Sequence, residues 1–271
     1  MRPVAVVGNL TLDRRGAGPL RPGGGPFHAA RALRLLERPA ILVVRCSEGD
    51  RPALLPPLVS LGLPVHWRPA ARTAIFGIDY AGEERRLEVE SLGSPWSLED
   101  AAWASRLLSG SDWVHVAPLS RSDFGPAALA ALARGRRLSL DGQGLVRVPR
   151  EGPLELDADF DRSLLESVSI LKLSEEEALV AAGGLEERAL LALGVPEVVV
   201  TLGSRGAIVL ADGLAERIPA RALPATSIDP TGAGDAFAAS YLVARAGGSG
   251  PPGAAHWASG VVQGLLGGRL R

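Results

Sequence analysis

Short runs of aliphatic and β-branched residues alternate along the chain with stretches whose apolar residues recur at helical spacing. The runs fall at residues 4–7, 41–44, 113–116, 138–141, 169–171 and 198–202. A helical pattern occupies residues 27–36, and further helices are expected between the later runs. This alternation is typical of a mainly parallel sheet with helices on both faces. We therefore predict a three-layer α/β/α fold with a mainly parallel central sheet.

Two neighbouring stretches break this pattern. "TAIFGIDY" (73–80) and "ERRLEVE" (84–90) alternate between apolar and polar residues with period two around the turn "AGEE" (81–84). With a further extended segment at 10–20, they predict a small sheet that stands off the main domain as a lid; the alternative is an extension of the main sheet. We expect one domain over residues 1–271, with a discontinuous β lid formed by about 10–20 and 73–90. The exposed edge of such a lid favours a homodimer.

Local signals mark several helix ends. Ser97 with Asp100, and Ser174 with Glu177, have the spacing of capping boxes and predict that helices begin after each serine. "GGSGPPG" (247–253) predicts a flexible break between the last two helices.

The stretch "SIDPTGAGDAFAAS" (227–240) carries the strongest chemical signal. A glycine-rich loop, Gly232-Ala233-Gly234, leads directly into an apolar helix, so its backbone N–H groups form an anion site of the kind that binds phosphate. Asp235 follows at once, and two interpretations are open. Asp235 caps the helix, or its carboxylate takes the proton from a substrate hydroxyl as that hydroxyl attacks a phosphoryl group.

Three further segments offer groups that complement this loop. Glu177 follows "LKLSEE" at the start of a helix and could hold Mg²⁺ through water, although a capping role accounts for it equally well. The turn "TLGSRG" (201–206) follows a strand and sits where α/β sheets bind ligands, or is an ordinary turn. Asp13 and the glycines Gly23 and Gly24 supply a carboxylate for hydroxyl groups and an approachable backbone, or are loop residues.

The composition narrows the classes of partner. A formal net charge of −1 provides no basic field for nucleic acid or for an acidic membrane surface, so small molecules are the expected partners. Of the 29 basic residues, Lys172 is the only lysine, and codon bias is the simplest explanation. Cys46 is the only cysteine, which excludes an intrachain disulfide. The N-terminal apolar run is too short for a signal peptide, and no uncharged apolar stretch reaches the roughly 18 residues of a membrane span. A cytoplasmic location is expected.

Several familiar sites are excluded by inspection. The only lysine does not follow a glycine, which removes a Walker A loop, and neither G-x-S-x-G nor H-E-x-x-H occurs. No pair of the four histidines has metal-ligand spacing. "GGGPFHAA" (23–30) lacks the third glycine of a dinucleotide fingerprint and lies far beyond the first strand, which disfavours a Rossmann-type oxidoreductase.

Taken together, these motifs resemble the ribokinase-like, or pfkB, family of carbohydrate kinases over nearly the full length of the chain. "VVGNLTLD" with "PGGGPFHAARAL" is similar to the family's first signature, and "DPTGAGDAFAASYL" to its second, which is highly specific. "LKLSEEEALV" is similar to the N-x-x-E segment, with Ser174 in place of the asparagine, and "VVVTLGSRGAIVL" to the nucleotide strand and turn. "HVAPLSRSD" and "LSLDGQGLVRVP", with its aspartate-x-Gln-Gly-x-x-Arg run, look most like the short myo-inositol kinase-like branch.

The resemblance implies an ATP- and Mg²⁺-dependent kinase that phosphorylates a hydroxyl of a sugar or cyclitol. It implies that Asp235 is the base and that Gly232, Ala233 and Gly234 form the anion hole. The other implied roles are these: Asp13, Gly23, Gly24 and His28 hold the acceptor, where His28 replaces the asparagine common in the family; Thr201, Gly203, Gly206 and Ser259 line the nucleotide site; and Glu177 assists Mg²⁺.

Two alternatives remain open at this point. A non-catalytic nucleotide- or sugar-binding regulator could use the same fold, although Asp235 argues against it. A sugar-phosphate acceptor would require a cationic pocket near the lid, for which the candidates are Arg14, Arg15, Arg85 and Arg86.

Overall fold

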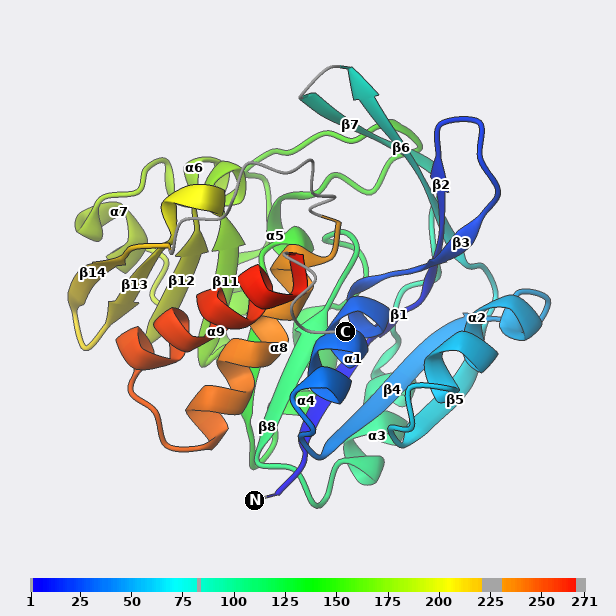
Figure 1. Ribbon diagram of the computed structural model, residues 1–271, viewed down its shortest axis with the longest axis horizontal. Coiled ribbons are helices and arrows are strands. Elements are labelled where there is room, and N and C mark those ends of the chain that lie inside the picture. Colours follow the sequence, from blue (N-terminus) through cyan, green and yellow to red (C-terminus); the bar gives the residue numbers. More distant parts are fainter. Residues whose placement is uncertain (1, 82–83, 221–230, 267–271) are drawn as a thin grey trace.

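Two β-sheets of unequal size organise the protein (Figure 1). The computed structural model describes residues 2–81, 84–220 and 231–266. The strands of the large sheet are β1 (Val4–Asn9), β4 (Ala40–Ser47), β5 (Val65–Ala70), β8 (Trp113–Ala117), β9 (Arg137–Asp141), β11 (Ile170–Ser174), β12 (Glu197–Thr201), β13 (Ala207–Ala211) and β14 (Leu214–Ile218). Their order is β14-β13-β12-β11-β9-β8-β1-β4-β5. All neighbours from β5 to β12 pair in parallel, and β13 and β14 add an antiparallel hairpin at one edge.

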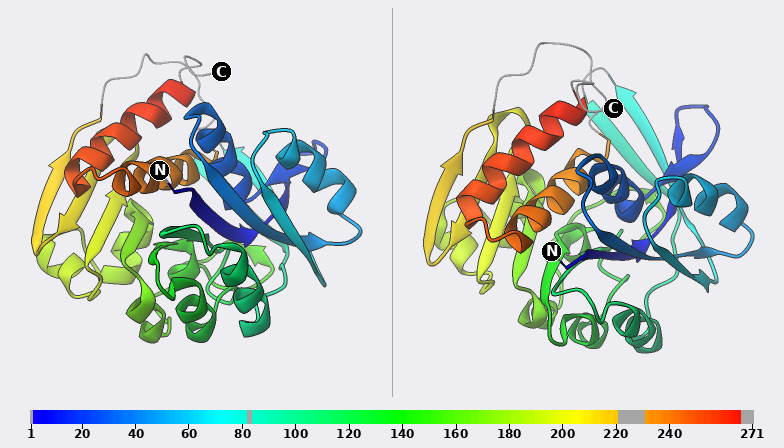
Figure 2. Two further views of the ribbon diagram at one scale, coloured as in Figure 1. Left: turned by 90° about the horizontal axis from the view of Figure 1, so that it is seen from below. Right: turned by 60° about the horizontal axis from the view of Figure 1, so that its bottom comes forward.

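Helices cover both faces of this sheet, as Figure 2 shows. One face carries α1 (Gly25–Leu35), α2 (Arg51–Val59), α8 (Ala233–Ala246) and α9 (Pro251–Leu266). The other carries α3 (Leu98–Leu107), α4 (Pro126–Ala133), α5 (Gln143–Val146), α6 (Glu175–Ala182), α7 (Glu187–Leu191) and the short 3₁₀ helix η1 (Arg162–Ser167). Successive side chains of β1 point to opposite faces of the sheet: Val4 and Val6 pack toward the first set of helices, and Ala5 and Val7 toward the second. The predicted three-layer α/β/α fold is confirmed.

The smaller sheet projects beyond one end of the large sheet (Figure 1). Its strands are β2 (Thr11–Arg15), β3 (Arg21–Gly23), β6 (Ala74–Ala81), β7 (Glu84–Ser91) and β10 (Gly152–Pro153), in the order β10-β7-β6-β2-β3. It has a separate apolar cluster of Ala74, Phe76, Val89 and Leu119. The small sheet predicted from alternation is therefore present, and it is not an extension of the main sheet. Residues 82–83 of the predicted turn lie outside the described residues.

The last two helices differ in one respect from the sequence-based expectation. Residues 247–250 separate α8 from α9, but Pro251, Pro252 and Gly253 belong to the first turn of α9 and not to the break. Proline is tolerated there because the first N–H groups of a helix have no partner within it. Within the described residues, no helix combines the length and the apolar character needed to cross a bilayer.

The middle of α8 is completely buried. Residues 236–244 are all buried, because the helix lies between α1 and α9 on the sheet. A helix that is apolar on every side is expected to be enclosed in this way. The enclosure fixes the position of its N-terminus, at which residues 231–235 are described and residues 227–230 of the predicted loop lie outside the described part.

Candidate active site

A pocket of about 1030 Å³ opens where the carboxyl ends of β9, β11 and β12 meet the small sheet and the N-terminus of α8. Ligands of open α/β sheets bind at such strand ends. The sequence-predicted residues that line it are Asp13, Gly24, His28, Glu177, Thr201, Gly203, Gly206, Gly232, Ala233, Gly234, Asp235 and Ser259. The structure thus brings together, from five separate segments, nearly all the candidates that the sequence suggested.

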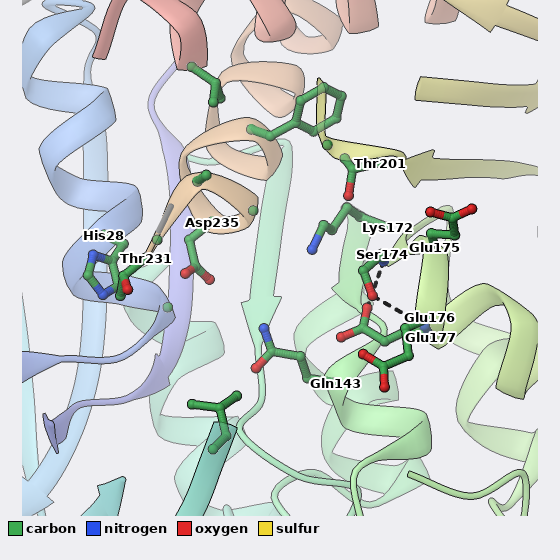
Figure 3. Close-up of a pocket in the computed structure, with 18 of the residues that line it drawn as sticks. His28, Gln143, Lys172, Ser174, Glu175, Glu176, Glu177, Thr201, Thr231 and Asp235 are labelled. Atoms are coloured by element: carbon green, nitrogen blue, oxygen red, sulfur yellow. Dashed lines mark hydrogen bonds between the residues drawn. The ribbon is translucent and has the colours of Figure 1, made fainter. Parts of the chain in front are cut away.

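The N-terminus of α8 forms one side of this pocket (Figure 3). Gly232 is the N-cap residue and adopts φ 79°, a left-handed conformation that favours glycine. A Cβ atom on Gly232 would lie 2.4 Å from the His28 ring, so this close approach also requires glycine. The following N–H groups begin a helix of 14 residues, whose positive end attracts an anion.

Asp235 is the third residue of α8 and not its N-cap, which is Gly232. Its half-buried carboxylate lines the pocket and lies against the start of α1, because a Cβ on Gly25 would be 2.9 Å from Asp235 Oδ1. The N-cap position proposed as the alternative for Asp235 is therefore occupied by another residue. The carboxylate is placed beside the anion site, where a substrate hydroxyl could reach it.

Asp13 reaches the pocket from β2 of the small sheet. Thr11 Oγ1 donates a hydrogen bond of 2.6 Å to Asp13 Oδ1, which orients the carboxylate. Gly24 lines the pocket as the N-cap of α1 with φ 93°. Gly23 is not among the described lining residues, since it packs behind Asp13: a Cβ at this position would be 2.0 Å from Asp13 Oδ2. Gly23 therefore packs against Asp13 and supports it, and a direct contact of Gly23 with the acceptor stays a prediction.

Glu177 lies in the capping box that its spacing predicted. The Ser174 N–H donates to Glu177 Oε2 at 2.8 Å, and the Glu177 N–H donates to Ser174 Oγ at 3.2 Å. Burial raises the pKa of Glu177, while the nearby Lys172 ammonium opposes that rise. The second predicted capping box, Ser97 with Asp100, is also present at the start of α3.

The candidate nucleotide residues lie at the opposite end of the pocket from the small sheet. Thr201 Oγ1 donates to the Leu173 carbonyl at 3.2 Å, which anchors the end of β12 to β11. Gly203 begins the 3₁₀ helix η2 (Gly203–Arg205), and Gly206 follows it with φ 95°. Ser259 lines the same pocket from α9.

Two buried residues behind the anion loop were not singled out from the sequence. Lys172 Nζ donates to Asp141 Oδ2 at 3.1 Å, and a Cβ on Gly234 would be 3.0 Å from that Nζ. Burial would raise the pKa of Asp141, but Lys172 and His115 hold it below its ordinary value. Two features of the sequence could have drawn attention to them: Lys172 is the only lysine, and Asp141 begins the "DGQG" run. Neither feature indicates that the two side chains are in contact.

Gln143 and Arg147, from the same run, line the pocket as well. Three of the four lid arginines suggested for a cationic acceptor site have described side chains, and these three do not line the pocket. Arg14, Arg15 and Arg86 are not among the described residues that line the pocket, and Arg14 pairs with Glu90 at 3.0 Å. The side chain of Arg85 lies outside the described part of the structure.

Comparison with known proteins places these features in a family context. Residues 151–261, which include β11, the turn after β12 and the N-terminus of α8, match the model of the pfkB family carbohydrate kinases.

Solved structures resemble the chain over nearly its whole length. A pyrophosphate-dependent kinase in the ribokinase family, complexed with a pyrophosphate analog and myo-inositol, is 23% identical, with 97% of this chain and 94% of that chain covered and a TM-score of 0.82. Arabidopsis thaliana ribokinase complexed with ribose and ATP is 20% identical, with coverages of 98% and 92% and a TM-score of 0.74. Escherichia coli phosphofructokinase-2 in its tetrameric inhibited form is 16% identical, with coverages of 98% and 94% and a TM-score of 0.73.

At these identities the structural likeness establishes the fold, and the family match adds the sequence pattern of carbohydrate kinases. The predicted resemblance is confirmed: the chain has the ribokinase-like fold, and residues 151–261 match the model of the pfkB family carbohydrate kinases.

Proposed function

We propose that the protein is a phosphotransferase that moves the γ-phosphoryl group of ATP to a hydroxyl of a sugar or cyclitol. One observation carries this proposal: the Asp235 carboxylate and the N-terminus of α8 face the same pocket, which also contains Asp13 on the side of the small sheet. A base, an anion site and a group that can hold hydroxyls are the components that phosphoryl transfer to an alcohol requires.

Asp235 acts as the general base in this proposal. The acceptor oxygen gives its proton to the Asp235 carboxylate as it forms a bond to the γ-phosphorus, while the bond from that phosphorus to the ADP oxygen breaks. The products are the phosphorylated acceptor, ADP and a proton. The N–H groups of Gly232, Ala233 and Gly234 stabilise the charge that develops on the phosphoryl oxygens, where the loss of one comparable donor costs about 3–4 kcal/mol of barrier.

The acceptor lies between α8 and the small sheet. Asp13, Gly24 and His28, supported by Gly23, bind its hydroxyl groups, and Gln143 adds a neutral donor and acceptor from the other side. Apolar side chains of the small sheet and the segment that follows β10 complete the enclosure: Phe76, Ile78, Leu87, Leu154 and Leu156. A lid of this kind excludes water, which would otherwise accept the phosphoryl group.

The donor occupies the remaining length of the pocket, past the anion loop toward α9. Thr201, Gly203, Gly206 and Ser259 line this end, with apolar contributions from Val262 and Leu266 that suit the face of a nucleobase. This extension beyond the anion loop favours ATP over a smaller donor.

Mg²⁺ fits the acidic side chains that line the pocket from the start of α6. Glu175, Glu176 and Glu177 line it with carboxylate oxygens, the ligand type that Mg²⁺ prefers, while the described residues contain no cluster of three side chains arranged to hold a metal by themselves. An ion held partly by donor phosphates and water, with Glu177 acting through water, agrees with this donor set. When bound, it would neutralise charge on the donor phosphates.

Pyrophosphate is the alternative donor. The structural neighbour with a TM-score of 0.82 is described as pyrophosphate-dependent and was solved with myo-inositol, which favours a cyclitol acceptor as well. The same anion loop and base would serve either donor.

The test is acceptor-dependent product release from Mg·ATP and, separately, from Mg·pyrophosphate. The acceptor panel contains myo-inositol, ribose, fructose, 2-keto-3-deoxygluconate, fructose phosphates and nucleosides, and ADP or orthophosphate is measured. We expect one acceptor class to stimulate release with ATP. Stimulation by pyrophosphate alone would replace the donor assignment and leave the acceptor assignment intact.

Asp235→Asn tests the base and separates a kinase from a non-catalytic binding protein. We expect turnover to fall by about 10²–10⁴-fold, because the amide cannot take the proton, while donor binding is retained. Asp212→Asn is the matched control, since Asp212 is exposed and its φ of 52° suits asparagine. A folded Asp235→Asn variant that turns over at the wild-type rate would contradict the assignment. Absence of transfer from every donor, with ATP still bound, would favour the binding-protein alternative.

The cytoplasmic location and a homodimer through the small sheet stay predictions of the sequence.

A further inference from the structure

The strands β6 and β7 send apolar and polar side chains to opposite faces of the small sheet. Phe76, Ile78 and Leu87 line the pocket. Asp79 and Glu88 alternate with them along the two strands; both are exposed, and neither lines the pocket. Among the described side chains of β6 and β7, those that line the pocket therefore contain no hydrogen-bonding group.

Neighbouring segments extend these three residues into a larger apolar surface. Ile78 and Leu87 are directly opposite each other in the antiparallel pair of β6 and β7. The Leu154 N–H donates to the Leu87 carbonyl at 2.9 Å, which places Leu154 beside β7. Leu119 belongs to the same apolar cluster as Phe76. We call the apolar lining residues of these segments the apolar wall: Phe76, Ile78, Leu87, Leu119, Leu154 and Leu156.

The groups that can bind hydroxyls lie beside the apolar wall and on the large-sheet side of the pocket. Asp13 on β2 is the register partner of Phe76 on β6, and both residues line the pocket. The Gln143 amide and the Asp235 carboxylate come from α5 and α8, and Figure 3 shows both pointing into the same space. An acceptor held by these polar groups therefore has one side against the apolar wall.

Such a surface discriminates by the direction of an acceptor's hydroxyls. A hydroxyl pressed against it loses its hydrogen bonds to water and gains no partner, which lowers affinity by about 10- to 100-fold. A C–H group in the same place gains from burial. In a six-membered ring whose hydroxyls are equatorial, the axial positions carry hydrogen and give each side of the ring a C–H face.

Resting on the proposed function, we propose that the acceptor is a six-membered ring polyol that binds with one C–H face against the apolar wall. Ile78 and Leu87 are then specificity-determining residues, because they reject a ring with an axial hydroxyl on that face. The competing explanation is that the wall only excludes water and leaves the choice of acceptor to the polar side of the pocket.

Stereoisomers of inositol test this proposal in the wild-type protein, because they share one composition and differ only in hydroxyl direction. Both epi- and chiro-inositol have two axial hydroxyls. In epi-inositol the two lie on the same face and leave the other face entirely C–H, whereas chiro-inositol has one on each face. We expect calorimetry to show that scyllo-, myo- and epi-inositol bind and that epi-inositol binds about 10- to 100-fold more tightly than chiro-inositol. Equal affinities for epi- and chiro-inositol, or no binding of any isomer, would overturn the proposal.

Two double variants test the assignment to Ile78 and Leu87. Threonine and valine have nearly the same shape and both suit strands, so Ile78→Thr, Leu87→Thr differs from Ile78→Val, Leu87→Val only in its two hydroxyls. We expect the valine variant to keep the preference for epi- over chiro-inositol. In the threonine variant the preference should shrink to a few-fold, because the new hydroxyls can pair with an axial hydroxyl. The same preference in both variants would remove the role of these two residues. The isomer comparison stays decisive if a variant does not fold, because it uses the wild-type protein.

The outcomes also separate this inference from the proposed function. Acceptor-dependent phosphoryl transfer without discrimination between epi- and chiro-inositol would retain the kinase and reject the selection by the wall. Face-selective binding without transfer from ATP or pyrophosphate would retain the selection and reject the kinase. Neither binding of an isomer nor transfer to any acceptor would reject both.

Discussion

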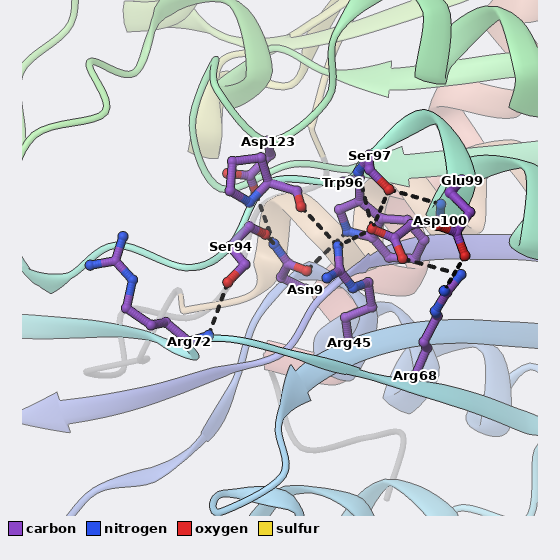
Figure 4. Close-up of polar contacts among 11 residues, drawn as sticks. Asn9, Arg45, Arg68, Arg72, Ser94, Trp96, Ser97, Glu99, Asp100 and Asp123 are labelled. Atoms are coloured by element: carbon purple, nitrogen blue, oxygen red, sulfur yellow. Dashed lines mark hydrogen bonds and ion pairs between the residues drawn. The ribbon is translucent and has the colours of Figure 1, made fainter.

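The protein contains two buried polar clusters. In one, the polar groups bind one another, and in the other, several of them face the pocket. The first, which we call the junction network, joins the large sheet to the segments beside the small sheet (Figure 4). Asn9 accepts from Trp96 Nε1 at 2.9 Å and donates to Asp123 Oδ2 at 3.3 Å. Arg45 pairs with Asp100 at 2.8 Å and stacks over the Trp96 ring. Nearly all of its polar groups bind other parts of the protein.

The second cluster, which we call the pocket cluster, contains Lys172, Asp141, Glu177 and Asp235. It lies at the ends of β9 and β11 and at the start of α8, and three of its members line the pocket. Its ion pair is as deeply enclosed as that of Arg45 and Asp100, but the Lys172 ammonium projects into the pocket.

The comparison shows that burial of charge has different consequences in the two places. In the junction network, polar groups satisfy one another and fix the position of the small sheet relative to the large one. In the pocket cluster, three carboxylates act on one buried ammonium, and Arg147 acts on Glu177 as well. Charges held together in this way are more typical of functional sites. Variants at matched positions in the two clusters should therefore separate stability from activity.

The largest expected difference is between Lys172→Met and Arg45→Met. Lys172→Met leaves Asp141 without its cation, and we expect the free energy of unfolding to fall by about 3–5 kcal/mol. Arg45→Met should cost about 1–3 kcal/mol, because Asp100 keeps its 3.3 Å contact with Arg68 and its bonds to Ser97. Chemical denaturation measures both values.

The same pair should differ in activity. Folded Arg45→Met should turn over at the wild-type rate, and Lys172→Met should not. An Arg45 variant that is less stable than the Lys172 variant, or that loses turnover, would remove the distinction between the two clusters.

The pH dependence of stability offers a finer comparison. One buried group in or beside each cluster titrates between about pH 4 and 6.5, and the two groups change the free energy of unfolding in opposite directions as pH rises. Burial raises the pKa of Asp123 to about 6, despite hydrogen bonds from Leu119 N–H, Ser120 and Asn9 that oppose the rise. The folded state then binds more protons than the unfolded state between pH 4 and 6, so this group makes stability fall as pH rises.

His115, behind Asp141, acts the other way. Burial lowers its pKa to about 4, so the unfolded state binds more protons between about pH 4 and 6.5, and stability falls as pH falls. Each effect corresponds to roughly 3 kcal/mol, so in wild type they largely cancel. Relative to wild type, Asp123→Asn should become more stable as pH rises from 4 to 6, and His115→Gln should become less stable. Denaturation at several pH values tests this; parallel curves for all three proteins would show that neither group titrates as inferred.

The smallest expected effects concern the two capping boxes, which have the same geometry in different surroundings. Ser97→Ala and Ser174→Ala should each lower the free energy of unfolding by about 1 kcal/mol, since each removes an N-cap acceptor. Ser174→Ala should also lower turnover several-fold, because Ser174 orients Glu177 in the pocket, while Ser97→Ala should leave it unchanged. Equal turnover in the two variants would indicate that Glu177 does not contribute to the reaction.

Much of the architecture could be predicted from local pattern. The buried parallel strands are short apolar runs, and the β6 and β7 hairpin alternates between apolar and polar residues with period two. These two patterns predict a buried strand and a half-exposed hairpin, respectively. Other elements were not recognised. Helix α2 contains Pro56 and Pro57 in its interior, and β5 carries a histidine and an arginine in half-buried positions and a proline in an exposed one. Their tertiary contacts outweigh weak local preferences.

The site was predictable to the extent that its chemistry is local. The anion loop and Asp235 are contiguous, and a glycine-rich loop before a helix can be recognised in the sequence alone. The contact of Gly23 with Asp13 could not be predicted from the sequence, because it exists only once β2 and β3 have paired. The same holds for Lys172 and Asp141, which are 31 residues apart and meet only because β9 and β11 are neighbours in the sheet.

The sequence by itself determined the alternation of buried strands and helices, the glycine-rich entry to α8 and the class of chemistry those residues permit, since these depend on neighbours along the chain. Only the tertiary structure decided that Gly232 and not Asp235 caps α8, and that the single lysine lies against the anion loop. The physical reason is that charge and hydrogen bonding depend on distance in space, and parallel strands bring together residues whose separation along the chain carries no information about that distance.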